Sequence, residues 1–231
     1  MTIADADSAS LHLLEGTHVV AAGRRIPVPE GSKRLVAFVA LNSRKVDRCH
    51  AAGVLWPEAD RHRAAGNLRS AMWRLRCAGL NILYTDKCWL LLHPDLRVDV
   101  EGVFDWADRL VTGKTGLADL DLDPKALRAL DLFPGWYDDW VLQERERLRQ
   151  TVLRAVDDLA RLLVMANRHG DAIEAALTAV SVDPLRESTQ RTLMEAHLAE
   201  GNRCEALRSF ASYKSLLARE LGVRPSFELT I

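Results

Sequence analysis

The chain has 231 residues, of which 48% are hydrophobic and 27% are charged, and its formal net charge is −1 at pH 7. These proportions exclude a disordered or fibrous chain, and the length favours two domains over one. The apolar runs fall well short of the roughly 20 residues that cross a membrane, and the polar, acidic start MTIADADSAS is unlike a signal peptide. We therefore expect a cytoplasmic protein that has no membrane partner.

The first part of the chain predicts short strands followed by helices. LHLLEG, HVVAAG and RRIPVP, over 11–28, alternate or carry β-branched residues, and each ends at a glycine or proline. Ser32 can cap a first helix over about 33–42. The pattern over 46–55 predicts a second helix, which Pro57 stops.

A third helix is expected over roughly 61–78, with Asp60 as its cap. After it, ILYTD and CWLLLH on either side of Lys87 predict a β-hairpin. A further helix is expected over 99–112. Strands, three helices and a closing hairpin follow the order of a winged-helix domain, so the sequence predicts a mixed α/β winged-helix domain over 1–112.

The third helix is strongly basic. It carries five arginines between positions 61 and 76, and no acidic residue occurs between Asp60 and Asp86. Over 24–76, twelve Lys and Arg stand against four Asp and Glu, a net +8, whereas over 113–231 sixteen stand against nineteen, a net −3. A basic domain joined to a mildly acidic one favours a polyanionic partner for the first. A solvated basic face, which needs no partner, is the alternative.

Two faces can be distinguished on this helix. The apolar positions recur at helical spacing and predict a stripe for the core, made of Ala64, Leu68, Ala71 or Met72, and Leu75. On another face Asn67, Ser70 and Arg74 follow one another at i, i+3 and i+7, with Trp73 beside them. In a DNA major groove Asn can pair with adenine and Arg with guanine, and flanking arginines can hold phosphates.

The second half of the chain predicts an all-α domain over 113–231, because helix follows helix from Pro124 onward. TGKTGLADLDLDP, over 112–124, is the linker candidate. GDAIEA at 170–175 matches GNRCEA at 201–206 with an offset of 31, near the period of tetratricopeptide-like helix pairs. Ala175 and Ala206 would then be equivalent small residues at which neighbouring helices approach closely. Two unrelated helix starts with similar caps are the alternative.

The sequence shows no group of residues typical of a catalytic, cofactor or metal site, so we expect no enzyme.

The cysteines at 49, 77, 88 and 204 include no C-x-x-C pair and are typical of scattered thiols in a reducing cytosol. Gly113-Lys114-Thr115 is like the end of a phosphate-binding loop, but Asp108 stands where that loop requires glycine. The tryptophans at 136 and 140 more often pack a helical core than line a ligand pocket.

The run DRCHAAGVLWPEADRHRAAGNLRSAMWRLR resembles the Streptomyces antibiotic regulatory protein family. The matching features are Leu55-Trp56-Pro57, Ala65, Asn67-Leu68 and Arg74-Leu75-Arg76, then Val98-Asp99-Val100 through Phe104. The second half resembles the bacterial transcriptional activation domain that these regulators carry. Its matching features are Phe133-Pro134-Gly135, Asp139-Trp140, Glu144-Arg145, Leu148, Asp183-Pro184, Glu187, Glu220-Leu221-Gly222-Val223, Pro225 and Glu228-Leu229.

The resemblance implies a transcriptional activator with an OmpR-type winged helix. Such a protein binds tandem repeats of double-stranded DNA as a homodimer and contacts RNA polymerase holoenzyme. The DNA-binding residues that we expect are Arg61, Arg63, Asn67, Arg69, Ser70, Trp73, Arg74, Arg76 and Lys87. The family's wing has a glycine before its aromatic residue, where this chain has Cys88 before Trp89.

Two expectations complete this interpretation. No ATPase, sensor or phosphopeptide-binding module is expected after the activation domain. The alternative function is a helical-repeat adaptor whose basic domain docks an acidic protein, and sequence preference in duplex DNA binding would distinguish the two.

Overall fold

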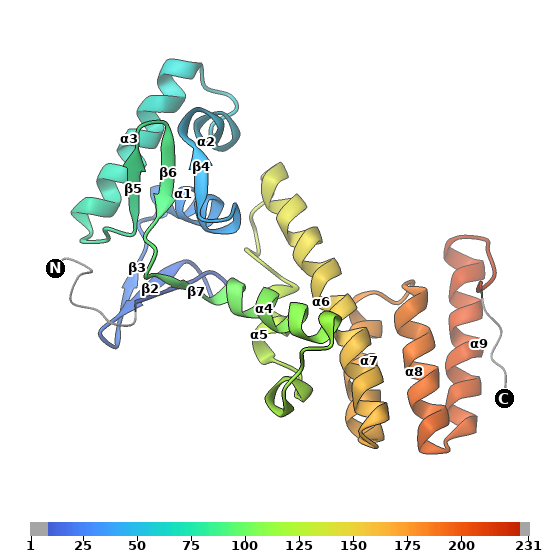
Figure 1. Cartoon of the computed structure of the whole chain (residues 1–231). Helices are drawn as coiled ribbons and strands as arrows, with labels where there is room; N and C mark the ends of the chain where they lie inside the picture. The colour runs from blue at the N-terminus through green and yellow to red at the C-terminus, as the bar shows by residue number, and fades with distance from the viewer. Residues whose placement is uncertain (1–8, 227–231) are drawn as a thin grey trace. The chain divides into compact units, whose positions relative to one another are not determined.

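The computed structural model describes residues 9–226 (Figure 1). Packing divides the chain into two compact units. The first comprises the residues up to Gly102 together with Arg128–Arg147, and the second comprises Val103–Leu127 together with the chain from Leu148 onward. The two units are therefore interleaved along the sequence. Among the described helices, none is long and apolar enough to cross a membrane.

The first unit opens with the small sheet that the sequence predicts. Its strands are β1 (Ser10–His12), β2 (His18–Ala21), β3 (Arg24–Pro27) and β7 (Arg97–Val98), in the order β3-β2-β1-β7. β1, β2 and β3 are antiparallel neighbours, and β7 pairs with β1 in parallel. Leu11 and Val19 are partners across β1 and β2, and both are buried. Their burial fixes the register of this pair, because a shift of either strand by one residue would turn its buried side chain to the other face of the sheet.

Three helices of the first unit pack against one another, namely α1 (Glu30–Leu41), α2 (Arg48–Leu55) and α3 (Arg61–Cys77). The prediction that Ser32 caps the first helix is wrong, because Pro29 stands at the cap position and Ser32 lies inside α1. The Ser32 side chain is fully buried, and its Oγ donates a hydrogen bond to the carbonyl oxygen of Ala71 at 2.8 Å. A buried hydroxyl requires a partner, and here the partner ties α1 to α3.

Aspartates define the starts of α2 and α3. The predicted second helix began two residues too early, because Val46 belongs to β4 (Lys45–Asp47), which pairs with a strand of the hairpin. Asp47 then caps α2 by accepting hydrogen bonds at 2.9 Å from the backbone N–H groups of the second and third helical residues. Asp60 caps α3 as predicted, since its Oδ1 accepts from the backbone N–H of Arg63 at 2.9 Å.

The predicted hairpin is present as β5 (Leu83–Asp86) and β6 (Trp89–Leu92), and β4 extends it to a sheet of order β4-β6-β5 (Figure 1). Asp86 pairs with Trp89, so the turn consists of Lys87 and Cys88 alone. Lys87 has a φ of 48°, in the left-handed region that Gly and Asn usually provide in such turns. This hairpin is the wing of the winged-helix fold.

The prediction that residues 112–124 form a linker is wrong, because this segment is folded. This segment follows α4 (Asp99–Thr112), forms the short 3-10 helix η2 (Leu117–Leu120) and leads into α5 (Pro124–Ala129). Asp119 of η2 is buried and accepts hydrogen bonds from Arg109, at 2.8 Å from Nη2, and from the backbone N–H of Gly116 at 2.9 Å. These bonds to Arg109 and Gly116 lower the pKa of Asp119. The segment is therefore folded against α4.

The second unit continues as a stack of helices, α6 (Asp139–Met165, shared with the first unit), α7 (His169–Val182), α8 (Glu187–Glu200) and α9 (Arg203–Glu220). α7 packs against α8 and α8 against α9 (Figure 1). α9 begins 34 residues after α7, and left-handed residues 34 apart, Asn167 and Gly201, precede the two helices. The repeat is thus present, but its offset is 34 and not the predicted 31. Ala206 corresponds to Ala172, not to Ala175, and both are fully buried.

Residues 128–147 pack within the first unit. The ring of Trp140 lies edge-on to that of Phe38 in α1, with centroids 5.2 Å apart, and only 7% of Trp140 is exposed. Arg34 of α1 donates from Nε to both oxygens of Asp138 at 3.0 and 3.1 Å. The interpretation of Trp140 as a core residue is confirmed.

Candidate nucleic-acid interface

The side of α3 that faces the core is the predicted apolar stripe. Ala64, Leu68, Ala71, Met72 and Leu75 are each at most 6% exposed. Burying a Leu side chain contributes about 1.5–3 kcal/mol, so this stripe fixes the rotation of α3 about its axis. The directions of the other side chains of α3 relative to the core are therefore fixed as well.

The opposite side of α3 is basic and without counter-charges. Its five arginines are all exposed, and none makes an ion pair within the described range 9–226. They are Arg61, Arg63, Arg69, Arg74 and Arg76. Other cations of the same unit do have acidic partners: Arg34 pairs with Asp138, and Arg44 donates to Glu101 at 2.8 Å. The five unpaired arginines give this helix a positive surface that can attract an anion.

The residues predicted to face bases lie along this exposed side. Ser70 and Arg74 are exposed, Trp73 is 64% exposed, and Asn67 is half-buried. Gly66 lies one turn before Ser70, and a Cβ added there would meet only the end of the Arg69 side chain, at 3.8 Å. An aromatic ring as large and as exposed as that of Trp73 is a signal for contact with another molecule.

Arg74 differs from the other four arginines because its guanidinium lies against Gly31 of α1. Its Nη1 lies 2.9 Å from the position that a Cβ of Gly31 would take, and its Cζ lies 3.3 Å from it. Glycine at position 31 therefore provides the space in which this side chain lies. No local sequence pattern predicts this contact, because the two residues are 43 positions apart and only the packing of α1 on α3 brings them together.

The wing tip brings two predicted residues into one hollow. A cavity of about 580 Å³ lies between α2, the start of α3 and the wing, and Arg61 and Lys87 both line it. Arg48 of α2 lines it as well, and its backbone N–H donates to the carbonyl oxygen of Cys88 at 2.8 Å. Arg48 contributes to the net charge of 24–76 but is not among the predicted DNA-binding residues, because the arginines predicted to bind DNA all lie on α3 and Arg48 lies on α2. It adds a third cation to the group formed by Arg61 and Lys87.

The structure therefore groups the predicted residues unequally. The eight residues on α3 lie around the part of the helix that the apolar stripe leaves free, seven of them exposed and Asn67 half-buried, and Lys87 lines the hollow with only the first of them, Arg61. The turn at Lys87 and Cys88 forms without the family's glycine, because Lys87 itself takes the left-handed conformation. Lys45 of β4 covers the ring of the neighbouring Trp89, with Nζ 4.4 Å from its centroid.

Comparison with known proteins agrees with this architecture. Residues 124–231 match the family of bacterial transcriptional activator domains. Regulatory protein AfsR of Streptomyces griseus is 32% identical over 145 residues, which make up 61% of this chain and 14% of that protein. The structure of Mycobacterium tuberculosis EmbR in complex with a low-affinity phosphopeptide has a TM-score of 0.70 at 18% identity. This alignment covers 94% of this chain and 62% of the EmbR chain, and at that identity it shows the fold alone.

This chain spans only a small part of AfsR and less than two thirds of EmbR. The fold is that of an N-terminal winged helix followed by a helical array, as the sequence predicted. The resemblance to regulators of this type is confirmed, and residues 124–231 match the model of the bacterial transcriptional activator domain.

Proposed function

We propose that the chain is a sequence-specific DNA-binding transcriptional regulator, an activator that binds tandem repeats near promoters. In this proposal residues 1–112 form the DNA-binding domain and residues 113–231 the activation domain. α3 enters the major groove, two copies bind neighbouring repeats as a homodimer, and the activation domain contacts RNA polymerase holoenzyme in the cytoplasm. The observation that carries the proposal is the exposed side of α3, whose five arginines have no acidic partner within residues 9–226.

Electrostatics and shape both support DNA as the partner. The major groove is about 12 Å wide and admits an α-helix, and the exposed side of α3 presents donors along its whole length. An acidic protein surface would satisfy the arginines but would not require Asn67 and Ser70, which fit the edges of bases, on the same side of the helix. The rival function, an adaptor that docks an acidic protein, is therefore the less favoured one.

The test is selection of duplexes from a random library by the full chain, followed by titration of the selected duplex between about 50 and 200 mM salt. A regulator enriches one sequence motif, and the logarithm of its binding constant falls linearly with that of the salt concentration. Enrichment of no motif, with equal binding to every duplex, would support the adaptor and contradict the proposal.

Arg63→Ala and Arg76→Ala are expected to weaken binding to the selected duplex and to random DNA equally. Both side chains are exposed on α3 without acidic partners, and phosphate contacts carry no sequence information. The slope of log K against log salt should become shallower by about one unit for each contact that is lost. A changed base preference at an unchanged slope would show that these arginines contact bases.

Insertion of half a helical turn between two repeats is expected to abolish cooperative binding of two copies. Repeats separated by one turn, about 10–10.5 bp, face the same side of the duplex, so a half-turn moves one copy to the opposite side. Footprinting and transcription assays with the full chain measure both effects, and insertion of a whole turn is the control that restores the shared side. Equal cooperativity on all spacers would exclude contact between the two copies.

A further inference from the structure

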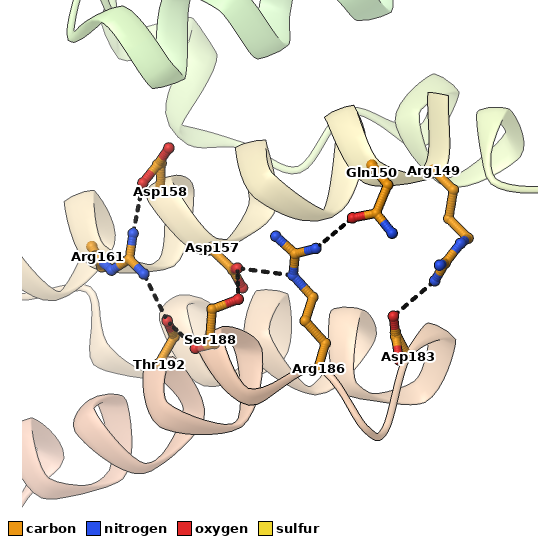
Figure 2. A network of polar contacts seen from close by, with 9 residues as sticks. All are labelled: Arg149, Gln150, Asp157, Asp158, Arg161, Asp183, Arg186, Ser188 and Thr192. Atoms are coloured by element: carbon orange, nitrogen blue, oxygen red, sulfur yellow. Dashed lines mark hydrogen bonds and ion pairs between the residues drawn. The ribbon is translucent and has the colours of Figure 1, made fainter. Parts of the chain in front are cut away.

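The second unit contains a polar groove that α3 does not explain. It has a volume of about 700 Å³, and apart from Val111 the residues that line it are polar or charged. One face of α6 supplies Gln150, Arg154, Asp157, Asp158 and Arg161, and the start of α8 supplies Ser188, with Arg186 just before it. Figure 2 shows most of these side chains joined in one network.

Two of the three arginines in this groove are already bound. Arg186 donates from Nη1 to Gln150 Oε1 at 2.7 Å, and its Nε lies 3.4 Å from Asp157 Oδ2 (Figure 2). Arg161 donates from Nη1 to Asp158 Oδ1 at 2.7 Å. Arg154 lies one turn before Asp158 on α6 and is exposed. Its guanidinium makes no hydrogen bond or ion pair in the described part of the chain. Its charge is therefore available to a ligand.

Asp157 is the second group that lacks a complete set of partners. It is only 4% exposed, and its Oδ2 accepts a hydrogen bond from Ser188 Oγ at 2.8 Å. Its other oxygen, Oδ1, is buried and has no partner within residues 9–226. A buried acceptor that lacks a donor costs about 1–3 kcal/mol, so a ligand N–H group that reaches Oδ1 when the side chains around it move would gain a hydrogen bond.

We propose that this groove binds an extended acidic segment of a partner protein. An acidic side chain of the segment pairs with Arg154, and a backbone N–H of the same segment donates to Asp157 Oδ1. Val111, 40% exposed at the edge of the groove, contacts an apolar side chain of the segment. The inference goes beyond the proposed function, because it concerns a protein ligand of the helical unit and does not require DNA.

The composition of the groove favours a peptide over a free phosphate or a nucleotide. Arg161 and Arg186 are already neutralised by carboxylates, and the carboxylates of Asp157 and Asp158 would repel an anion that concentrates several charges on one group, such as a phosphate. An extended acidic segment spreads its carboxylates along the chain, so one of them can lie at Arg154 while a backbone amide nearby provides the donor that Asp157 lacks. Pockets for small molecules are mostly apolar, whereas this groove is polar.

The test uses the full chain and a fluorescein-labelled peptide in which glutamate alternates with serine around one central leucine. A second peptide carries glutamine in place of every glutamate. Arg154→Glu is expected to weaken binding of the glutamate peptide by about tenfold or more, because a charge-assisted hydrogen bond becomes a repulsion. Arg203→Glu is the matched control, since Arg203 is exposed on α9, outside the groove, and its change of charge is the same. It should leave the affinity within about twofold, as expected for a distant surface charge.

The outcomes separate the possible explanations. Binding of the glutamate peptide that is lost in Arg154→Glu and kept in Arg203→Glu supports the proposal. Equal affinity for the glutamate and glutamine peptides, equal weakening by both variants, or displacement of the peptide by inorganic phosphate alone would overturn it. Thermal unfolding of each variant checks the fold, and binding of the selected DNA duplex by Arg154→Glu, expected to be unchanged, keeps this result distinct from failure of the DNA proposal.

Discussion

Replacement of Trp140 by Ala is expected to lower the free energy of unfolding of the first unit by about 3–5 kcal/mol, the usual cost of removing a buried Trp or Phe side chain. The Trp140 ring is 7% exposed and lies edge-on to Phe38 of α1. Trp140 lies 28 residues beyond the predicted end of the DNA-binding domain at residue 112. Its removal should therefore destabilise α1, the helix that carries Ser32 and supports α3.

Two variants control for this result. Trp140→Phe keeps an aromatic ring and removes a buried Nε1–H that lacks a partner among the described residues, so it should cost less than Trp140→Ala. Trp73→Ala removes a side chain that is 64% exposed on α3, and its effect on stability should stay within about 0.5 kcal/mol. We expect Trp73→Ala to weaken DNA binding instead.

Urea unfolding followed by circular dichroism, together with native-state hydrogen exchange of the α1 amides, measures the effect. Faster exchange in α1 for Trp140→Ala, but not for Trp73→Ala, would show that residues 128–147 support the winged helix in solution. Unchanged exchange in α1 would mean that this segment does not pack there, and fragments that end at residue 112 would then retain full stability.

Local patterns predicted much of the first unit. The apolar stripe of α3, the Asp60 cap and the hairpin around Lys87 each depend on residues a few positions apart, and the structure contains all of them. The side of α3 that faces solvent followed from the stripe, because a helix with one buried face has its other positions fixed. Which of the exposed side chains contact DNA does not follow from such patterns and stays a prediction.

Features that depend on distant contacts could not be predicted in this way. Ser32 has the sequence features of a helix cap, yet its hydroxyl bonds to Ala71, 39 positions away. The segment over 112–124 has the composition of a linker, but Asp119 is bound by Arg109. The repeat offset was wrong by three residues because the match of Gly170 to Gly201 compared an internal residue of α7 with the residue that ends α8.

Replacement of Arg74 by Ala is expected to weaken binding to the selected duplex by about 1–3 kcal/mol and to relax the preference at one base pair. The expectation depends on the position of Arg74 on the exposed side of α3, one turn after Ser70. A bidentate contact with guanine O6 and N7 is the commonest specific contact of arginine with DNA. Loss of such a contact affects the selected duplex far more than random DNA, which fluorescence titration of both duplexes measures.

Gly31→Ala separates a base contact of Arg74 from its contact with α1. The added methyl group would lie 2.9 Å from Arg74 Nη1, so the guanidinium must move, and the flexible end of an arginine can do so. Alanine also favours the helical conformation by about 0.8–1.0 kcal/mol over glycine, which offsets the cost of the displacement. If Arg74 acts on bases, Gly31→Ala should bind the selected duplex at least as tightly as the parent, because the side chain already lies away from α1. If Arg74 serves instead to pack on α1, Arg74→Ala should lower the stability of the first unit, and neither variant should change the base preference.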